Sequence, residues 1–223
     1  KSMSSQTKSD VEKMRIVPYA QAIGSLIYAL TSTRPDICHV IGLVSRFQSN
    51  PGKEHWRAVK RIFRYLKSTN NLKLCFGLCD LDIKGYTNTD FTGFVDDRKS
   101  TSGHVFLFGG TIVSWLSKKQ NCVAKYTMEA EYIACGTIVS NAVRIKRFVD
   151  SLSGANNYKG KCIDVNYHYI QDIVEMREIK VNYIPSEEMV ANPITKELSL
   201  ERFKEHVANL GLKMPSKVVW LLI

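Results

Sequence analysis

Residues 103–115 read GHVFLFGGTIVSW and carry the clearest fold signal in the chain. Apolar runs lie on both sides of Gly109-Gly110, and a glycine pair is a common two-residue link between antiparallel strands. The stretch therefore predicts a β-hairpin. The same kind of pattern predicts short strands at residues 83–89, 103–108 and 111–115.

Helical patterns surround these strands. Apolar residues recur at helical spacing from about residue 18 to residue 67. After the hairpin, helices are expected at residues 127–152, 165–176 and 200–210, and a further strand at residues 179–184. Strands and helices along one chain predict an α/β fold.

Composition narrows the class of protein. The 223 residues are 44% hydrophobic and 23% charged, which is typical of a globular domain and excludes a wholly disordered chain. No apolar run approaches the ~20 residues of a membrane span, so no membrane partner is expected. The N-terminal stretch lacks the apolar core of a signal peptide. Because the first residue is Lys rather than Met, we expect a fragment or a processed product.

Charge and cysteine usage indicate a compartment and a partner. The net charge is +10, an excess that suits a polyanion. The six cysteines show no C-x-x-C pair and no zinc spacing, which favours free thiols in a reducing compartment. We therefore expect an intracellular location, in the cytoplasm or the nucleus.

Residues 53–67 form the most informative local pattern. At 100° per residue, six cations share an arc of roughly 120° on a helix, opposite an apolar side. Clustered cations release counterions when they neutralise phosphates, so this face is a candidate for nucleic-acid contact. The plain alternative is a solvated surface face. The six cations are Lys53, Arg57, Lys60, Arg61, Arg64 and Lys67.

Several longer blocks resemble one known family. They are PYAQAIGSLIYALTSTRPDI, SRFQSNPGKEHWRAVKRIFRYLK, GYTNTDFTG, DDRKSTSGHVF, IVSWLSKKQ, TMEAEYIA and VANPITK. Together they are similar to the C-terminal end of the polyprotein of copia-type LTR retrotransposons, plant elements in particular. The resemblance extends from about residue 16 to residue 212.

The resemblance implies four regions and an activity. Residues 1–15 are a flexible lead-in, residues 16–78 a helical reverse-transcriptase tail (thumb- or connection-like), residues 79–212 a ribonuclease H-like (RNase H-like) domain, and residues 213–223 a C-terminal tail. The fold that the resemblance implies is an RNase H-like mixed sheet flanked by helices and preceded by a small helical region. In the family, the RNase H domain cuts the RNA strand of an RNA–DNA hybrid. Four carboxylates there hold two Mg²⁺ ions that activate water and stabilise the leaving oxygen.

Only one of those carboxylates survives at its matched position. Asn88 and Asn192 stand where the family has aspartates, and Glu131 matches the family glutamate. The segment that carries the third aspartate is absent, together with about one central strand and one helix. Asp90 is a compensating ligand that, with Glu131, holds a metal weakly at best. The matched residues therefore predict that no Mg²⁺ is bound stably.

Three hypotheses follow. The leading one is a catalytically inactive, degenerate RNase H-like protein that acts as a nucleic-acid-binding or scaffold subunit. Its partners are an RNA–DNA hybrid or duplex and an assembly protein. The second is an active ribonuclease H in which Asp90 and Glu131 converge with Asp164 or Glu187. The third is a retroelement fragment without function. For the fold, three alternatives stay open. Residues 180–184 pair directly with residues 83–88, residues 157–163 fill the slot of the missing strand, or neither segment pairs and two sheet edges are left open.

Overall fold

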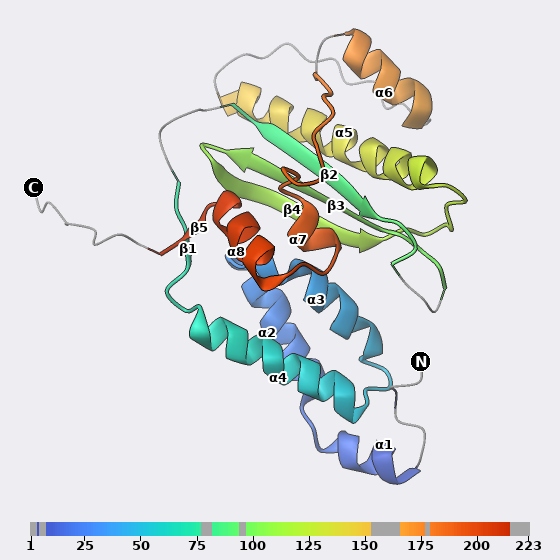
Figure 1. Cartoon of the computed structure of the whole chain (residues 1–223), viewed down its shortest axis with the longest axis vertical. Helices are drawn as coiled ribbons and strands as arrows, with labels where there is room; N and C mark the ends of the chain where they lie inside the picture. The colour runs from blue at the N-terminus through green and yellow to red at the C-terminus, as the bar shows by residue number, and fades with distance from the viewer. Residues whose placement is uncertain are drawn as a thin grey trace, which may run out of the picture.

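The computed structural model of the chain describes residue 4 and residues 8–76, 82–93, 97–152, 166–176 and 179–214. These residues form an α/β structure with a small sheet between two helical layers (Figure 1). The helices are α1 Lys8–Arg15, α2 Tyr19–Ser32, α3 Cys38–Val44, α4 Lys53–Ser68, α5 Thr127–Leu152, α6 Asn166–Glu175, α7 Asn192–Thr195 and α8 Leu200–Asn209. The strands are β1 Lys73–Leu74, β2 Lys84–Asp90, β3 Thr101–Phe108, β4 Thr111–Lys119 and β5 Leu212–Lys213. In this described part, no helix is both long and apolar enough to cross a membrane.

The predicted hairpin is confirmed. Strands β2, β3 and β4 form an antiparallel sheet in that order. Gly109 and Gly110, which join β3 to β4, have φ angles of 58° and 74°, a region that glycine adopts without steric cost. Successive β3 residues point to opposite faces, so Val105 and Leu107 face one helical layer and Phe106 faces the other.

The predicted strand at residues 179–184 is wrong. Those residues have no regular structure, and within the described chain β2 is therefore an edge strand and the sheet is antiparallel rather than mixed. Strand preference depends on a partner and on packing, and here Val181 and Tyr183 remain 53% and 90% exposed. The alternative pairing of residues 157–163 lies outside the described residues.

Helix α5 covers one face of the sheet, with α6 beyond it (Figure 1). Phe106 of β3 is buried against Ile138, Val139 and Val143 of α5 and Ile173 of α6. The opposite face packs on α7, α8 and α3. Its buried cluster contains Cys38, Val105, Leu107, Ile112, Val190, Ala191, Ile194 and Leu210.

Helices α2, α3 and α4 enclose a second apolar core. Its buried members are Tyr19, Ile23, Leu26, Ile37, Ile41, Val44, Val59 and Ile62. Residues 8–15, expected to belong to a flexible lead-in, instead form α1. Met14 of this helix is buried and Asp10 pairs with Lys53 at 3.1 Å, two contacts with the rest of the chain that the local composition does not reveal.

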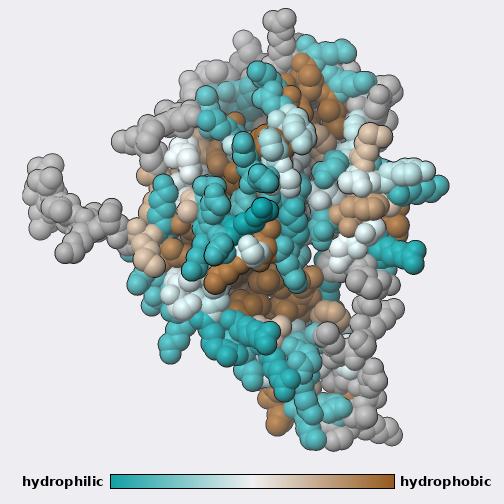
Figure 2. All heavy atoms as spheres, in the orientation of Figure 1, coloured by the Kyte–Doolittle hydropathy of each residue, from teal (hydrophilic) through white to brown (hydrophobic). Residues whose placement is uncertain are grey.

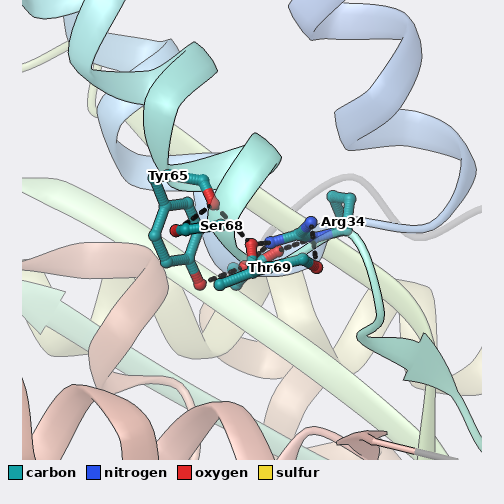
Figure 3. Close-up of polar contacts among 5 residues, drawn as sticks. Arg34, Tyr65, Ser68 and Thr69 are labelled. Atoms are coloured by element: carbon teal, nitrogen blue, oxygen red, sulfur yellow. Dashed lines mark hydrogen bonds and ion pairs between the residues drawn. The ribbon is translucent and has the colours of Figure 1, made fainter.

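A buried ion pair in the segment before α3 is hydrogen-bonded to the end of α4 (Figure 3). Nε and Nη2 of Arg34 donate to the two oxygens of Asp36 at 3.0 and 2.7 Å. The Tyr65 hydroxyl also donates to Asp36, at 2.6 Å, and Arg34 reaches the Thr69 hydroxyl at 2.7 Å. Burial and the adjacent Asp36 charge raise the pKa of Tyr65 well above its usual range. The network therefore leaves neither charge without a partner.

The helical region and the sheet region are packed together. Helix α3 contacts β4 and α7, and β1 pairs with β5. Because Cys38 of α3 is buried in the same cluster as Val105 of β3, the two regions share apolar core. The division into domains at residues 16–78 and 79–212 stays a prediction.

Candidate functional site

Three elements carry the positions that the sequence singled out, and two of these positions, Asn88 and Asn192, are brought into contact. Asn88 lies on β2, Glu131 in the first turns of α5, and Asn192 at the start of α7. Both α5 and α7 contact β2. Neighbouring side chains of β2 point to opposite faces of the sheet. The Asn88 amide donates a hydrogen bond to Asn192 of α7, and the Thr89 hydroxyl donates to the carbonyl of Ala130 on α5 at 3.3 Å.

The two asparagines are directly hydrogen-bonded. Nδ2 of Asn88 donates to Oδ1 of Asn192 at 2.9 Å and to the Thr195 hydroxyl at 2.8 Å. Nδ2 of Asn192 donates in turn to the carbonyl of Ser186 at 2.6 Å. Two positions 104 residues apart in the sequence therefore meet through neutral amides.

This network is buried on the α7 side and half-buried at Asn88. Asn192 is 3% exposed and Thr195 is fully buried. The Thr195 hydroxyl also bonds the carbonyls of Ala191 and Asn192. Gly103 of β3 lets α7 approach this closely, because a Cβ there would lie 2.5 Å from the Thr195 methyl group. The asparagine pair is therefore closely packed on the α7 side, where its hydrogen-bond partners are a neutral hydroxyl and a backbone carbonyl.

Two carboxylates lie beside this network. Burial raises the pKa of Asp90, the charge of Lys196 opposes that shift, and the charge of Glu197 adds to it. Burial also raises the pKa of Glu131, while hydrogen bonding from Thr89 and the charge of Lys196 act in the opposite direction. Lys196 is therefore a cation that acts electrostatically on both carboxylates.

The described residues contain no cluster of three or more His, Cys, Asp or Glu side chains placed to hold a metal ion. Glu187, one candidate for a replacement carboxylate, is exposed, and the other, Asp164, lies outside the described residues. The donor set that the structure does describe is two carboxylates and two amides. Since Asn192 Oδ1 already accepts a hydrogen bond, this set does not fit the charged oxygen ligands that two Mg²⁺ ions need.

The basic face is confirmed as an exposed helix face. Helix α4 spans Lys53–Ser68, and all six of its predicted cations are exposed, while Val59 and Ile62 on the other side are buried. Lys53 pairs with Asp10 at 3.1 Å and Arg57 with Glu54 at 2.5 Å. Figure 2 shows hydrophilic side chains along α4 in the lower half of the molecule, below an apolar band.

A cavity lies between α4 and the segment that follows α7. It has a volume of about 390 Å³ and is lined by Arg61 of α4, Lys196 after α7 and Phe203 of α8, among others. Tyr65 also lines it, and its ring meets that of Phe203 edge to face at 6.0 Å. Arg61 and Lys196, which are distant in the sequence, therefore line one cavity.

Sequence reasoning missed three members of the site. Thr195 and Ser186 complete the amide network, and Lys196 supplies the nearby cation. Thr195 and Lys196 belong to the VANPITK block, so their position in that block was the sequence feature that could have indicated a place in the site. Ser186 contributes only a backbone carbonyl, which no sequence pattern indicates.

Comparisons with known proteins point to one group. The chain is 43% identical over 225 residues to the retrovirus-related Pol polyprotein from transposon TNT 1-94 of Nicotiana tabacum, an alignment that covers 92% of this chain and 17% of that polyprotein. It is 30% identical over 217 residues to the corresponding polyprotein from transposon RE1 of Arabidopsis thaliana, which covers 87% of this chain and 15% of that polyprotein. The chain therefore spans about a sixth of the length of these relatives.

A shorter relative aligns along most of its own length. The secreted RxLR effector protein 161 of Plasmopara viticola is 42% identical over 131 residues, which cover 58% of this chain and 92% of that protein. No family model matches the chain. No solved structure matches it.

Proposed function

The chain belongs to the copia-type retrotransposon Pol polyproteins, and on that premise we propose that it is a degenerate RNase H-like unit that binds nucleic acid without cleaving it. The reverse-transcriptase tail would correspond to residues 16–78 and the RNase H-like unit to residues 79–212. The order of three antiparallel strands followed by a long helix, β2 to α5, supports this assignment.

The observation that carries the proposal is the hydrogen bond between Asn88 and Asn192. In the family these positions hold aspartates that bind Mg²⁺. Here one amide donates to the other, which stabilises the pair without any ion. Replacing each aspartate with asparagine removes one negative charge, and the remaining Asp90 and Glu131 fall short of a two-metal cluster. The function therefore has to be one that needs no phosphodiester hydrolysis.

The basic face of α4 supports nucleic-acid binding. Lys60, Arg64 and Lys67 are exposed, and no described carboxylate lies within ion-pair distance of them. Cations in this arrangement attract a phosphate backbone and release its counterions, and such binding weakens steeply with salt. Arg61 of the same face lines a cavity together with Lys196, and the carboxylates of Asp36 and Glu197 line it too.

Neutralising α4 is expected to weaken binding of an RNA–DNA hybrid. The variant Lys60→Gln/Arg64→Gln/Lys67→Gln removes three phosphate contacts, so we expect the affinity to fall on the order of 100-fold at low salt and the slope of log K against log salt to fall by about 2–3. Fluorescence anisotropy with a labelled hybrid at several salt concentrations measures both.

The matched control removes the same charge elsewhere. Lys118, Lys125 and Arg144 are exposed residues of β4, the loop before α5, and α5 itself. Their replacement by glutamine is expected to leave the affinity within about threefold of the unchanged protein, because only long-range attraction is lost. Equal losses in both triple variants would show that net charge rather than the α4 face drives binding.

A further inference from the structure

The cavity between α4 and the segment after α7 is lined mainly by apolar side chains. Its volume of about 390 Å³ lies within the range of small-molecule sites, about 300–1,000 Å³. Two aromatic rings, Tyr65 of α4 and Phe203 of α8, form part of its wall. The other apolar residues of the lining are Ile37, Val40, Ile62, Pro193 and Leu198. Figure 2 shows an apolar band here, between the hydrophilic surfaces of α8 and α4, so a flat, largely apolar ring fits this wall.

A buried histidine adds polar atoms to this wall. His39 of α3 lines the cavity and is 8% exposed, and no hydrogen bond joins its ring to another residue that the structure describes. Burial lowers the pKa of His39, the charge of Glu197 opposes that shift, and the charge of Arg46 adds to it. A neutral imidazole offers one donor and one acceptor. Glu197, which also lines the cavity, supplies carboxylate acceptors for N–H groups of a ligand.

Two cations border the cavity. Arg61 belongs to the basic face of α4, and Lys196 lies in the segment after α7. Asp36 lines the cavity too, but its side chain is fully buried and its charge is paired with Arg34. A phosphate beside a ring held in the cavity would therefore meet Arg61 and Lys196, next to the other cations of α4.

An apolar side chain of a partner protein is a poorer occupant. It would cover the nitrogens of His39 without offering them a hydrogen bond, and a polar group that is buried without a partner lowers stability. A nucleobase has the flat shape of an aromatic ring and carries hydrogen-bond donors and acceptors along its edge. Its own phosphate also provides the negative charge that Arg61 and Lys196 attract.

We propose that this cavity takes the base of an unpaired nucleotide in a nucleic-acid strand whose phosphates lie along α4. The base packs on the aromatic wall, and its polar edge faces His39 and Glu197. The adjoining phosphates meet Arg61 and Lys196. A base inside a duplex is stacked and paired, so the cavity selects a single-stranded overhang or loop. This inference rests on the nucleic-acid binding proposed above and adds the class of strand that is recognised.

The experiment compares labelled RNA–DNA hybrids in anisotropy titrations with the full chain. One hybrid is blunt, a second has a short 3′ DNA overhang, and a third has the same overhang with abasic sugars, which keep the phosphates but lack the bases. We expect the overhang with bases to bind about tenfold more tightly than the abasic overhang, because only a base can stack on the aromatic wall. An overhang with benzene rings in place of bases should bind about threefold more weakly than the natural one, because it lacks a polar edge.

Two variants locate the base. Val40→Trp fills the cavity from a position on α3 that is 37% exposed, and Phe203→Leu removes an aromatic ring from its wall. Each should reduce the advantage of the natural over the abasic overhang to less than about twofold. Binding of the blunt hybrid should stay unchanged, because no cation of α4 is altered. Val113→Trp, at a position of β4 that is 41% exposed, is the matched control and should keep the tenfold difference. Because Val40 is exposed, its variant keeps the test valid even if Phe203→Leu fails to fold.

Three results would overturn this inference. They are equal affinity for natural and abasic overhangs, a difference that survives Val40→Trp, and equal affinity for natural and benzene-bearing overhangs. The last result would assign the cavity to an apolar group such as a side chain of a partner protein.

A separate result would contradict the binding of nucleic acid by α4, namely that the blunt hybrid does not bind. The cavity can then be tested alone with 2-aminopurine riboside monophosphate, a nucleotide whose fluorescence falls when its base stacks on an aromatic ring. We expect the unchanged protein to quench this fluorescence and Val40→Trp to leave it unquenched. Unchanged fluorescence with both proteins would overturn the inference about the cavity as well.

Discussion

The double variant Asn88→Asp/Asn192→Asp is expected to be less stable than the unchanged protein by about 3–5 kcal/mol in the presence of EDTA. Aspartate at both positions removes the N–H donor of Asn88 that joins the two side chains and the N–H donor of Asn192 to Ser186, and it places a half-buried carboxylate against a buried one. Like charges at such a distance raise the free energy of the folded state. Urea denaturation followed by circular dichroism gives the free energy of unfolding.

A single variant and added Mg²⁺ separate the loss of hydrogen bonds from the repulsion between the two carboxylates. Asn88→Asp alone should cost about 1–3 kcal/mol, since it loses two donated hydrogen bonds, to Asn192 and Thr195. Millimolar Mg²⁺ should restore part of the stability of the double variant and leave the unchanged protein unaffected, because only the variant has charged oxygens at both positions.

The control makes the same charge change at the surface. Asn70 and Asn121 are exposed, and Asn70→Asp/Asn121→Asp should alter the free energy of unfolding by no more than about 0.5 kcal/mol. If the buried pair tolerated two aspartates as well as the surface pair does, the amide contact would not be the stabilising feature we describe.

Asp36→Asn is expected to cost about 3–5 kcal/mol of stability. Asp36 is 3% exposed and accepts two hydrogen bonds from Arg34 and one from Tyr65. Asparagine keeps the size of the side chain, but its NH₂ group must face one of these donors, and the Arg34 charge loses its buried counter-ion. Chemical denaturation measures the loss.

Glu54→Gln supplies the comparison for that variant. It breaks an ion pair with Arg57 in which both side chains are more than half exposed, so the expected cost is about 0.5 kcal/mol or less. Similar losses in Asp36→Asn and Glu54→Gln would contradict the view that the buried Arg34–Asp36 pair anchors the segment before α3 to α4.

The elements that the sequence predicts correctly are those that a local pattern of residues determines. The hairpin around Gly109 and the amphipathic helix α4 depend on spacing within a dozen or so residues, and both are confirmed. The meeting of Asn88 and Asn192 depends on contacts between distant segments. Only the resemblance to a family placed these two residues in one site, and it gave no indication of the hydrogen bond between them.

The wrong strand at residues 179–184 and the missed features have one cause, because each depends on contacts with distant parts of the chain. Residues 179–184 alternate in the way strands do, but an alternating pattern forms a strand only when an edge pairs with it. Helix α1 was missed because Met14 and Asp10 make their contacts with partners elsewhere in the chain. Thr195 was missed because a threonine becomes part of a polar site only through what it touches, here the amide of Asn88.

We propose that a neutral asparagine pair has replaced a metal-binding site and that the chain binds nucleic acid without cleaving it. Incubation of the chain and of its Glu131→Ala variant with a labelled RNA–DNA hybrid in Mg²⁺ or Mn²⁺ tests that claim most directly. We predict that neither protein cuts the RNA strand and that both retain the hybrid in a salt-sensitive manner. Cleavage by the unchanged chain that Glu131→Ala abolishes would contradict the account.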